Sequence, residues 1–176
     1  STLFPYTTLF RSRSKKVDAR QREQIKIDEQ LASQYYRDQD YEKARDLYAQ
    51  LFEKAEQTSH FQQYIDCLIL LKDYDKAEKE LKSFAKKRPS YYKADADLIY
   101  VYTLQDKTDK AKKRFNEILK DLPDNATTIR NISYALQARS LNDMAMAILE
   151  KGNKLLEGKE TFYMDQANLN LSTAKI

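Results

Sequence analysis

Four alanines recur along this chain at a nearly constant interval. Ala44, Ala77, Ala111 and Ala145 lie 33, 34 and 34 residues apart. Short polar stretches precede them, most clearly Asp-Tyr-Glu-Lys-Ala at the first and Asp-Tyr-Asp-Lys-Ala at the second. An apolar pattern with helical spacing flanks each alanine on both sides. A fixed period of this length predicts an array of helix-turn-helix repeats, and it constrains the fold more than any other feature.

The composition agrees with a helical chain. Only 2 Gly and 3 Pro occur in 176 residues, whereas a sheet-rich domain needs a turn about every 8 to 12 residues. Charged residues make up 33% of the chain, and its net charge of +4 is spread over interleaved Lys and Glu. This interleaving favours solvated helix faces over a nucleic-acid patch. Cys67 is the single cysteine, so an internal disulfide is excluded.

The chain divides into three parts. Residues 3–12 read as a translated DNA-sequencing adapter (CTC TTT CCC TAC ACG ACG CTC TTC CGA TCT), so we interpret residues 1–12 as a non-native tail that contributes nothing to folding. Residues 13–27 are charged and predict a polar helical lead-in. The repeat array is predicted over 28–176, in units of about 28–57, 58–91, 92–125, 126–159 and a truncated fifth unit, 160–176.

The fifth unit holds only a first helix, because its next repeat alanine would fall beyond Ile176. We therefore expect a longer protein, with Phe162, Tyr163 and Leu169 only partly covered by the fourth unit.

The repeat positions resemble the tetratricopeptide repeat (TPR). The third unit matches best. The structural repeat positions across the units are Ala44, Ala77, Ala111, Ala145, Leu81, Phe115, Pro89 and Pro123. The resemblance implies an all-α, right-handed α-solenoid of helix-turn-helix repeats. Each alanine would lie where the two helices of a pair cross, and Leu81 and Phe115 would fill the space between helices. The sequence is also similar to uncharacterised bacterial envelope TPR proteins, which favours a periplasmic or envelope location over the cytoplasm.

The TPR resemblance also implies a concave groove lined by the first helix of each pair. By the repeat phase, the groove-facing residues are Tyr36, Gln62, Asp66, Lys93, Tyr100, Arg130 and Tyr134. The tyrosines would be rigid anchors for a partner, and Lys93 and Arg130 would meet its acidic groups. The alternative is ordinary surface or inter-helix packing. The basic clamp by which some TPR domains hold a chaperone's carboxyl terminus is absent, since only Lys93 conforms to it.

No pattern in the sequence predicts catalysis. His60, the only histidine, lies at a repeat junction and is interpreted as a helix-start residue, and Cys67 as a small core residue. Asp95 and Asp97 are predicted on a solvated helix face. No phosphate loop, metal-ligand cluster or nucleophile motif occurs, so no catalytic residue, metal or cofactor is predicted.

Two functions remain open from the sequence. The first is a protein–protein interaction scaffold that binds a partner peptide or helix in the groove. The second is a TPR sensor or regulatory arm of a larger signalling or catalytic protein, continuing after Ile176. The expected partner is a protein or peptide; nucleic acid and membrane insertion are not expected. The sequence specifies neither the partner nor the native oligomeric state.

Overall fold

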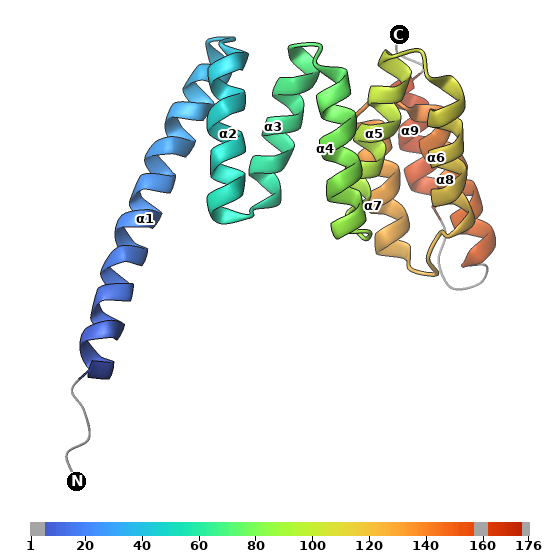
Figure 1. Cartoon of the computed structure of the whole chain (residues 1–176). Helices are drawn as coiled ribbons and strands as arrows, with labels where there is room; N and C mark the ends of the chain where they lie inside the picture. The colour runs from blue at the N-terminus through green and yellow to red at the C-terminus, as the bar shows by residue number, and fades with distance from the viewer. Residues whose placement is uncertain (1–5, 157–161, 174–176) are drawn as a thin grey trace. The chain divides into compact units, whose positions relative to one another are not determined.

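The computed structural model describes residues 6–156 and 162–173, and every regular element among these residues is an α-helix (Figure 1). The chain separates into two compact units, Ser1–Asp73 and Tyr74–Ile176, and each is described by itself. The first unit contains α1 (Tyr6–Arg37), α2 (Tyr41–Ala55) and α3 (Thr58–Leu70). The second contains α4 (Tyr74–Lys87), α5 (Tyr92–Leu104), α6 (Thr108–Lys120), α7 (Ala126–Gln137), α8 (Asn142–Leu155) and α9 (Tyr163–Thr173). The predicted all-α helical-repeat class is confirmed.

In the first unit, α2 packs against both α1 and α3. Helix α1 begins at Tyr6, inside the predicted tail, and continues without a break through the lead-in to Arg37 in the first repeat. Asp40 then caps α2, because its side chain accepts a hydrogen bond from the backbone N–H of Lys43. Ala44, Tyr48 and Leu51 are buried on one face of α2, at 0%, 5% and 0% exposure.

The four turns that precede the repeat alanines share one backbone conformation. Gln39, Lys72, Asp106 and Ser140 have positive φ values of 61°, 59°, 56° and 57°. In every case the N–H of the next residue donates to a carbonyl five residues earlier, at 2.9 to 3.0 Å. This is the Schellman arrangement that ends a helix through a left-handed residue. Glycine usually occupies that position, but here four other residue types do, which explains how so helical a chain turns with so few glycines.

In the second unit, α5 packs against α4, α6 and α7, and α8 packs against α7 and α9. Ala77, Ala111 and Ala145 on the second helices are at most 3% exposed. Leu81 is fully buried, and Phe115 is 9% exposed. Helix α4 ends at Lys87 and α6 at Lys120, in each case shortly before a proline, which cannot continue a helix.

Helix α9 is better covered than the sequence predicted. Phe162 and Leu169 are buried, with 0% and 2% of their surfaces exposed, although we expected only partial cover. The reason is local. The backbone N–H of Phe162 donates to the Asn153 side chain at 2.7 Å, and the ring lies against Gly152 of α8, where no side chain intervenes. Tyr163 remains exposed, because only one face of this short helix is buried.

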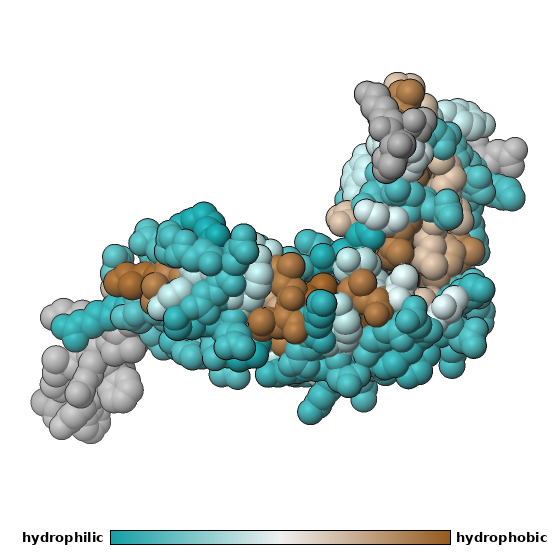
Figure 2. All heavy atoms as spheres, turned by 90° about the horizontal axis from the view of Figure 1, so that it is seen from above, coloured by the Kyte–Doolittle hydropathy of each residue, from teal (hydrophilic) through white to brown (hydrophobic). Residues whose placement is uncertain are grey.

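Hydrophilic side chains dominate the face drawn in Figure 2, and hydrophobic ones gather in separate groups. Among the helices of the described residues, none has the length and apolar character needed to cross a bilayer.

Candidate partner-binding groove

Four of the predicted groove residues lie on two neighbouring helices of the second unit. Lys93 and Tyr100 are seven positions apart on α5, and Arg130 and Tyr134 are four apart on α7. These intervals place the members of each pair on one side of their helix. Helices α5 and α7 pack together, and α9 contributes Asp165 beside α7. We call the surface formed by these five residues the groove face.

A cleft of about 430 Å³ is lined by the amino-terminal end of α5 and by residues along the length of α7. Lys93 and Tyr134 both line it, so the structure brings these two predicted residues together. Tyr91 and Tyr92 line the same cleft, and we call it the tyrosine cleft. Its remaining lining residues are small or polar: Ser90, Thr128, Asn131, Ala135 and Ala138. Three tyrosines and one lysine therefore converge on a space bounded by hydrogen-bonding groups.

Tyr134 and Arg130 share one carboxylate. The Tyr134 hydroxyl donates to Asp165 Oδ1 at 3.0 Å, and Arg130 Nε donates to Asp165 Oδ2 at 3.1 Å. The hydrogen bond to Asp165 raises the pKa of Tyr134, and burial adds to this. The Arg130 guanidinium also lies 5.0 Å from the centroid of the Phe162 ring. Arg130 thus pairs within the chain, and Tyr134 is held in position although 52% of its surface is exposed.

Tyr100 lies beside a buried ion pair, which corrects one expectation. Asp97 is 1% exposed, and Arg139 Nε donates to its Oδ1 at 2.6 Å. The same guanidinium lies 5.4 Å from the centre of the Tyr100 ring. The predicted solvated face at Asp95 and Asp97 is therefore wrong, since Asp95 is also buried and receives hydrogen bonds from Arg114. A buried carboxylate needs such a partner because desolvation is costly.

The other three predicted groove residues belong to the first unit. Tyr36 is half-buried, with its ring 5.5 Å from that of Tyr41 in an edge-on arrangement. Burial raises the pKa of Tyr36, and the nearby Asp66 charge raises it further. Asp66 is half-buried on α3, whereas Gln62 is 7% exposed and lies mostly inside the packing. The first unit therefore brings Tyr36 and Asp66 near one another and withdraws Gln62 from the surface.

Tyr91, Tyr92 and Asp165 were missed by the sequence reasoning. Tyr91 and Tyr92 stand at the junction after Pro89, where the repeat phase assigns no groove position. The adjacent tyrosines themselves were the available signal, because tyrosine is enriched at protein interfaces. Asp165 was hidden because its partners lie more than thirty positions earlier in the chain.

His60 and Cys67 have structural surroundings. His60 is 4% exposed, and its Nε2 lies 2.7 Å from Glu29 Oε1 in the first unit. Burial raises the pKa of the Cys67 thiol to about 12, so the thiol stays protonated and is a poor nucleophile near neutral pH. Within the part of the chain that the structure describes, no group of three or more His, Cys, Asp or Glu side chains is arranged to hold a metal ion.

The fold defines a helical-repeat protein of the α-solenoid class. Residues 68–139 match the tetratricopeptide repeat family model. This part of the chain thus carries tetratricopeptide repeats. No curated protein matches the sequence.

Solved structures of repeat proteins resemble this fold. The MamA RS-1 ArsTM double mutant is 15% identical with a TM-score of 0.50, over 85% of this chain and 84% of its own. MamA 41-end from Desulfovibrio magneticus RS-1 is 15% identical with a TM-score of 0.49, over 85% of each chain. YrrB, a TPR protein with an unusual peptide-binding site, is 16% identical with a TM-score of 0.43, over 82% of this chain and 71% of YrrB. At such identity, the first of these likenesses shows a shared fold alone.

Proposed function

We propose that the groove face of the second unit binds an extended peptide segment of a partner protein, and that the tyrosine cleft anchors it. The observation that carries this proposal is the convergence of Tyr91, Tyr92 and Tyr134 on one cleft of about 430 Å³. Pockets that hold a small ligand or a few side chains range over about 300–1,000 Å³, so this volume suits one or two side chains of a peptide.

The chemistry of the cleft fits a peptide. Tyrosine gives a large contact area with few rotatable bonds, so little conformational entropy is lost when it is covered. The polar residues at the rim can hydrogen-bond to peptide backbone, and Lys93 favours an acidic side chain or a carboxylate nearby. Asp165 holds the Tyr134 ring through its hydroxyl, which lowers the cost of ordering that ring on binding.

A scaffold role agrees with the family. Tetratricopeptide repeats are non-catalytic interaction modules, and such proteins bind other proteins or peptides. On the groove face, the Asp165 carboxylate engages both the Tyr134 hydroxyl and the Arg130 guanidinium and so holds both side chains in position. Binding is the function that these groups support best.

The test is selection of ligands from a random peptide library displayed on phage, with the whole chain as bait. Peptides that are enriched are synthesised with a fluorophore, and their affinity is measured by fluorescence anisotropy. We expect Tyr92→Ala and Tyr134→Ala each to weaken binding by roughly thirtyfold, which corresponds to about 2 kcal/mol for a binding hot spot. Lys79→Ala is the control, because Lys79 is exposed on α4 and does not line the cleft.

Tyr134→Phe separates the two contributions of that residue. It keeps the ring but removes the hydrogen bond to Asp165, so a smaller loss than in Tyr134→Ala is expected. Circular dichroism confirms that each variant stays helical. If the enriched peptides bind the unmodified chain and all four variants equally, or if selection enriches nothing above an unrelated bait, the tyrosine cleft is not the binding site.

A further inference from the structure

A second cleft, of about 440 Å³, lies between α4 and α6 and is distinct from the tyrosine cleft. Lys82 and Lys86 line it from α4, and Lys110, Lys113 and Arg114 line it from α6. We call it the basic cleft. The intervals of three and four residues place these side chains on one face of each helix. Because α5 packs against both helices, it brings the two basic rows to the same space.

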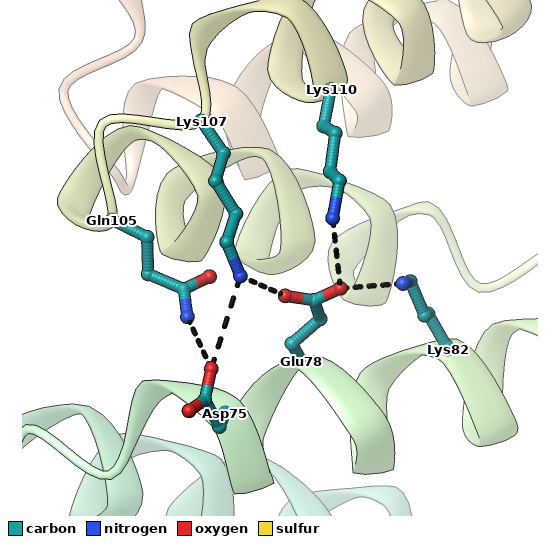
Figure 3. Close-up of polar contacts among 6 residues, drawn as sticks. All are labelled: Asp75, Glu78, Lys82, Gln105, Lys107 and Lys110. Atoms are coloured by element: carbon teal, nitrogen blue, oxygen red, sulfur yellow. Dashed lines mark hydrogen bonds and ion pairs between the residues drawn. The ribbon is translucent and has the colours of Figure 1, made fainter.

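At one end of the basic cleft, a buried carboxylate offsets part of the positive charge. Figure 3 shows the ammonium groups of Lys82, Lys107 and Lys110 around Glu78, at 2.5, 2.8 and 3.9 Å from its carboxylate oxygens. Burial opposes ionisation of Glu78, but the hydrogen bonds from Lys107 and Lys82 outweigh it and lower its pKa to about 2. A single negative charge is therefore shared among three positive ones, and Lys82 and Lys110 are only partly neutralised.

At the other end of the basic cleft, two carboxylates neutralise the positive charge more fully. Arg114 Nε donates to Asp95 at 3.0 Å, and its Nη1 donates to Glu117 at 2.8 Å. Lys86 and Lys113 also line the basic cleft. Both are exposed, and no carboxylate of the described residues lies within ion-pair distance of either. These two lysines therefore leave uncompensated positive charge in the basic cleft.

The floor of the basic cleft is apolar. Leu98 and Tyr102 of α5 and Ala85 of α4 contribute to its lining. The Tyr102 ring lies between two cations, with Lys82 Nζ 5.7 Å and Lys110 Nζ 5.8 Å from its centroid. Only 5% of the Tyr102 surface is exposed, so its ring face cannot stack on a base. Single-stranded nucleic acid relies on such stacking, which makes it a poor fit.

From this arrangement, we propose that the basic cleft binds an acidic peptide segment of a partner protein, with carboxylates meeting Lys86 and Lys113 and an apolar side chain over the α5 floor. The charge is complementary to such a segment, and the mixed lining matches alternating acidic and apolar residues. This surface is separate from the groove face, so the chain would hold two partner segments at two sites. The proposal does not depend on the tyrosine cleft.

The probe is a fluorescein-labelled peptide that repeats Glu-Glu-Leu, titrated with the whole chain and followed by anisotropy. The test variant is Lys86→Glu combined with Lys113→Glu. The matched control is Lys79→Glu combined with Lys112→Glu, which changes the same net charge on the same two helices at exposed positions that do not line the basic cleft. We expect a roughly tenfold or greater loss of affinity in the test variant, because reversing both charges opposes like charges.

Several results would overturn the proposal. One is equal loss in the test and control variants, which would indicate attraction by net charge alone. Another is absence of binding by the unmodified chain. A third is a single-stranded oligothymidylate or a phosphatidylserine vesicle that binds more tightly than the peptide and is lost in the test variant, which would assign the cleft another occupant. Tyr134→Ala should leave binding of this peptide unchanged; a loss there would place the peptide on the groove face instead.

Discussion

Gly152 offers a sharp test of how α9 is held, through the substitution Gly152→Ala. Two effects oppose each other. In a helix interior, alanine is favoured over glycine by about 0.5–1 kcal/mol, and on this ground alone the variant would be more stable. The added Cβ, however, would lie 2.7 Å from Phe162 Cε2 and 2.8 Å from Ile129 Cγ2, distances too short for such carbon atoms.

The steric effect should win at Gly152. Phe162 and Ile129 are both 0% exposed, and the β-branched Ile129 has few alternative rotamers, so neither side chain can move aside cheaply. Overpacking of a buried site costs about 1–3 kcal/mol. After the helix gain is subtracted, we expect a net loss of about 1 kcal/mol. In urea this lowers the midpoint by roughly 0.5 M, given the usual dependence of stability on denaturant.

The assay combines urea unfolding, followed by circular dichroism, with hydrogen exchange. Since a repeat array opens in parts, exchange in α9 should rise more than exchange in α5. The double variant Gly152→Ala with Phe162→Leu is the control, because a smaller side chain at 162 relieves the clash. The two substitutions should therefore be less than additive. A Gly152→Ala variant that is more stable than the parent would refute this account of the α8–α9 contact.

Four further predictions rest on single residues. Asp97→Ala should cost about 3–5 kcal/mol in urea unfolding, because it leaves the Arg139 charge largely buried without its carboxylate. Ala111→Leu should cost about 1–3 kcal/mol by overpacking α6 against α5, and an unchanged midpoint would contradict the repeat phase. Lys72→Gly should raise stability by about 0.5–1 kcal/mol, since its φ of 59° suits glycine. Glu78 has a lowered pKa when folded, so its contribution is present above the pKa of the unfolded chain and is lost as pH falls from about 5 to 2; Glu78→Gln should flatten that part of a stability–pH profile.

The fold was predictable from the sequence because the same spacing of small and apolar residues recurs in each repeat. An interval of 33 or 34 residues identifies the alanine positions, and the apolar spacing around each alanine identifies two helices. The turns were less visible. Their left-handed residues recur at the same interval, five positions before each alanine, but they include Gln39 and Lys72, which no turn rule singles out.

The site was predictable only in part, because repeat phase describes one helix at a time. It selected Lys93 and Tyr134, which do line one cleft. It could not assign the partners of Asp97 or of Arg130, since these lie 42 and 35 positions away and depend on how neighbouring pairs stack. The local sequence pattern therefore predicts which face of its helix a residue occupies. The ion pairs that neutralise a charged residue depend on how the helices of neighbouring repeats stack.

The same reasoning explains how burial adds to the basic character of the second unit's surface. Helix α4 holds five lysines and three acidic residues, and α6 holds five Lys or Arg residues and two acidic ones, so both helices are basic in sequence. In addition, Glu78, Asp95 and Asp97 are buried at 9%, 3% and 1% exposure, each held by cations from neighbouring segments of the chain. Every carboxylate withdrawn in this way leaves the lysines near it with fewer acidic neighbours in solvent. Burial of acidic residues in the repeat interior thus both fixes the stacking of the helices and exposes the positive charge of the basic cleft.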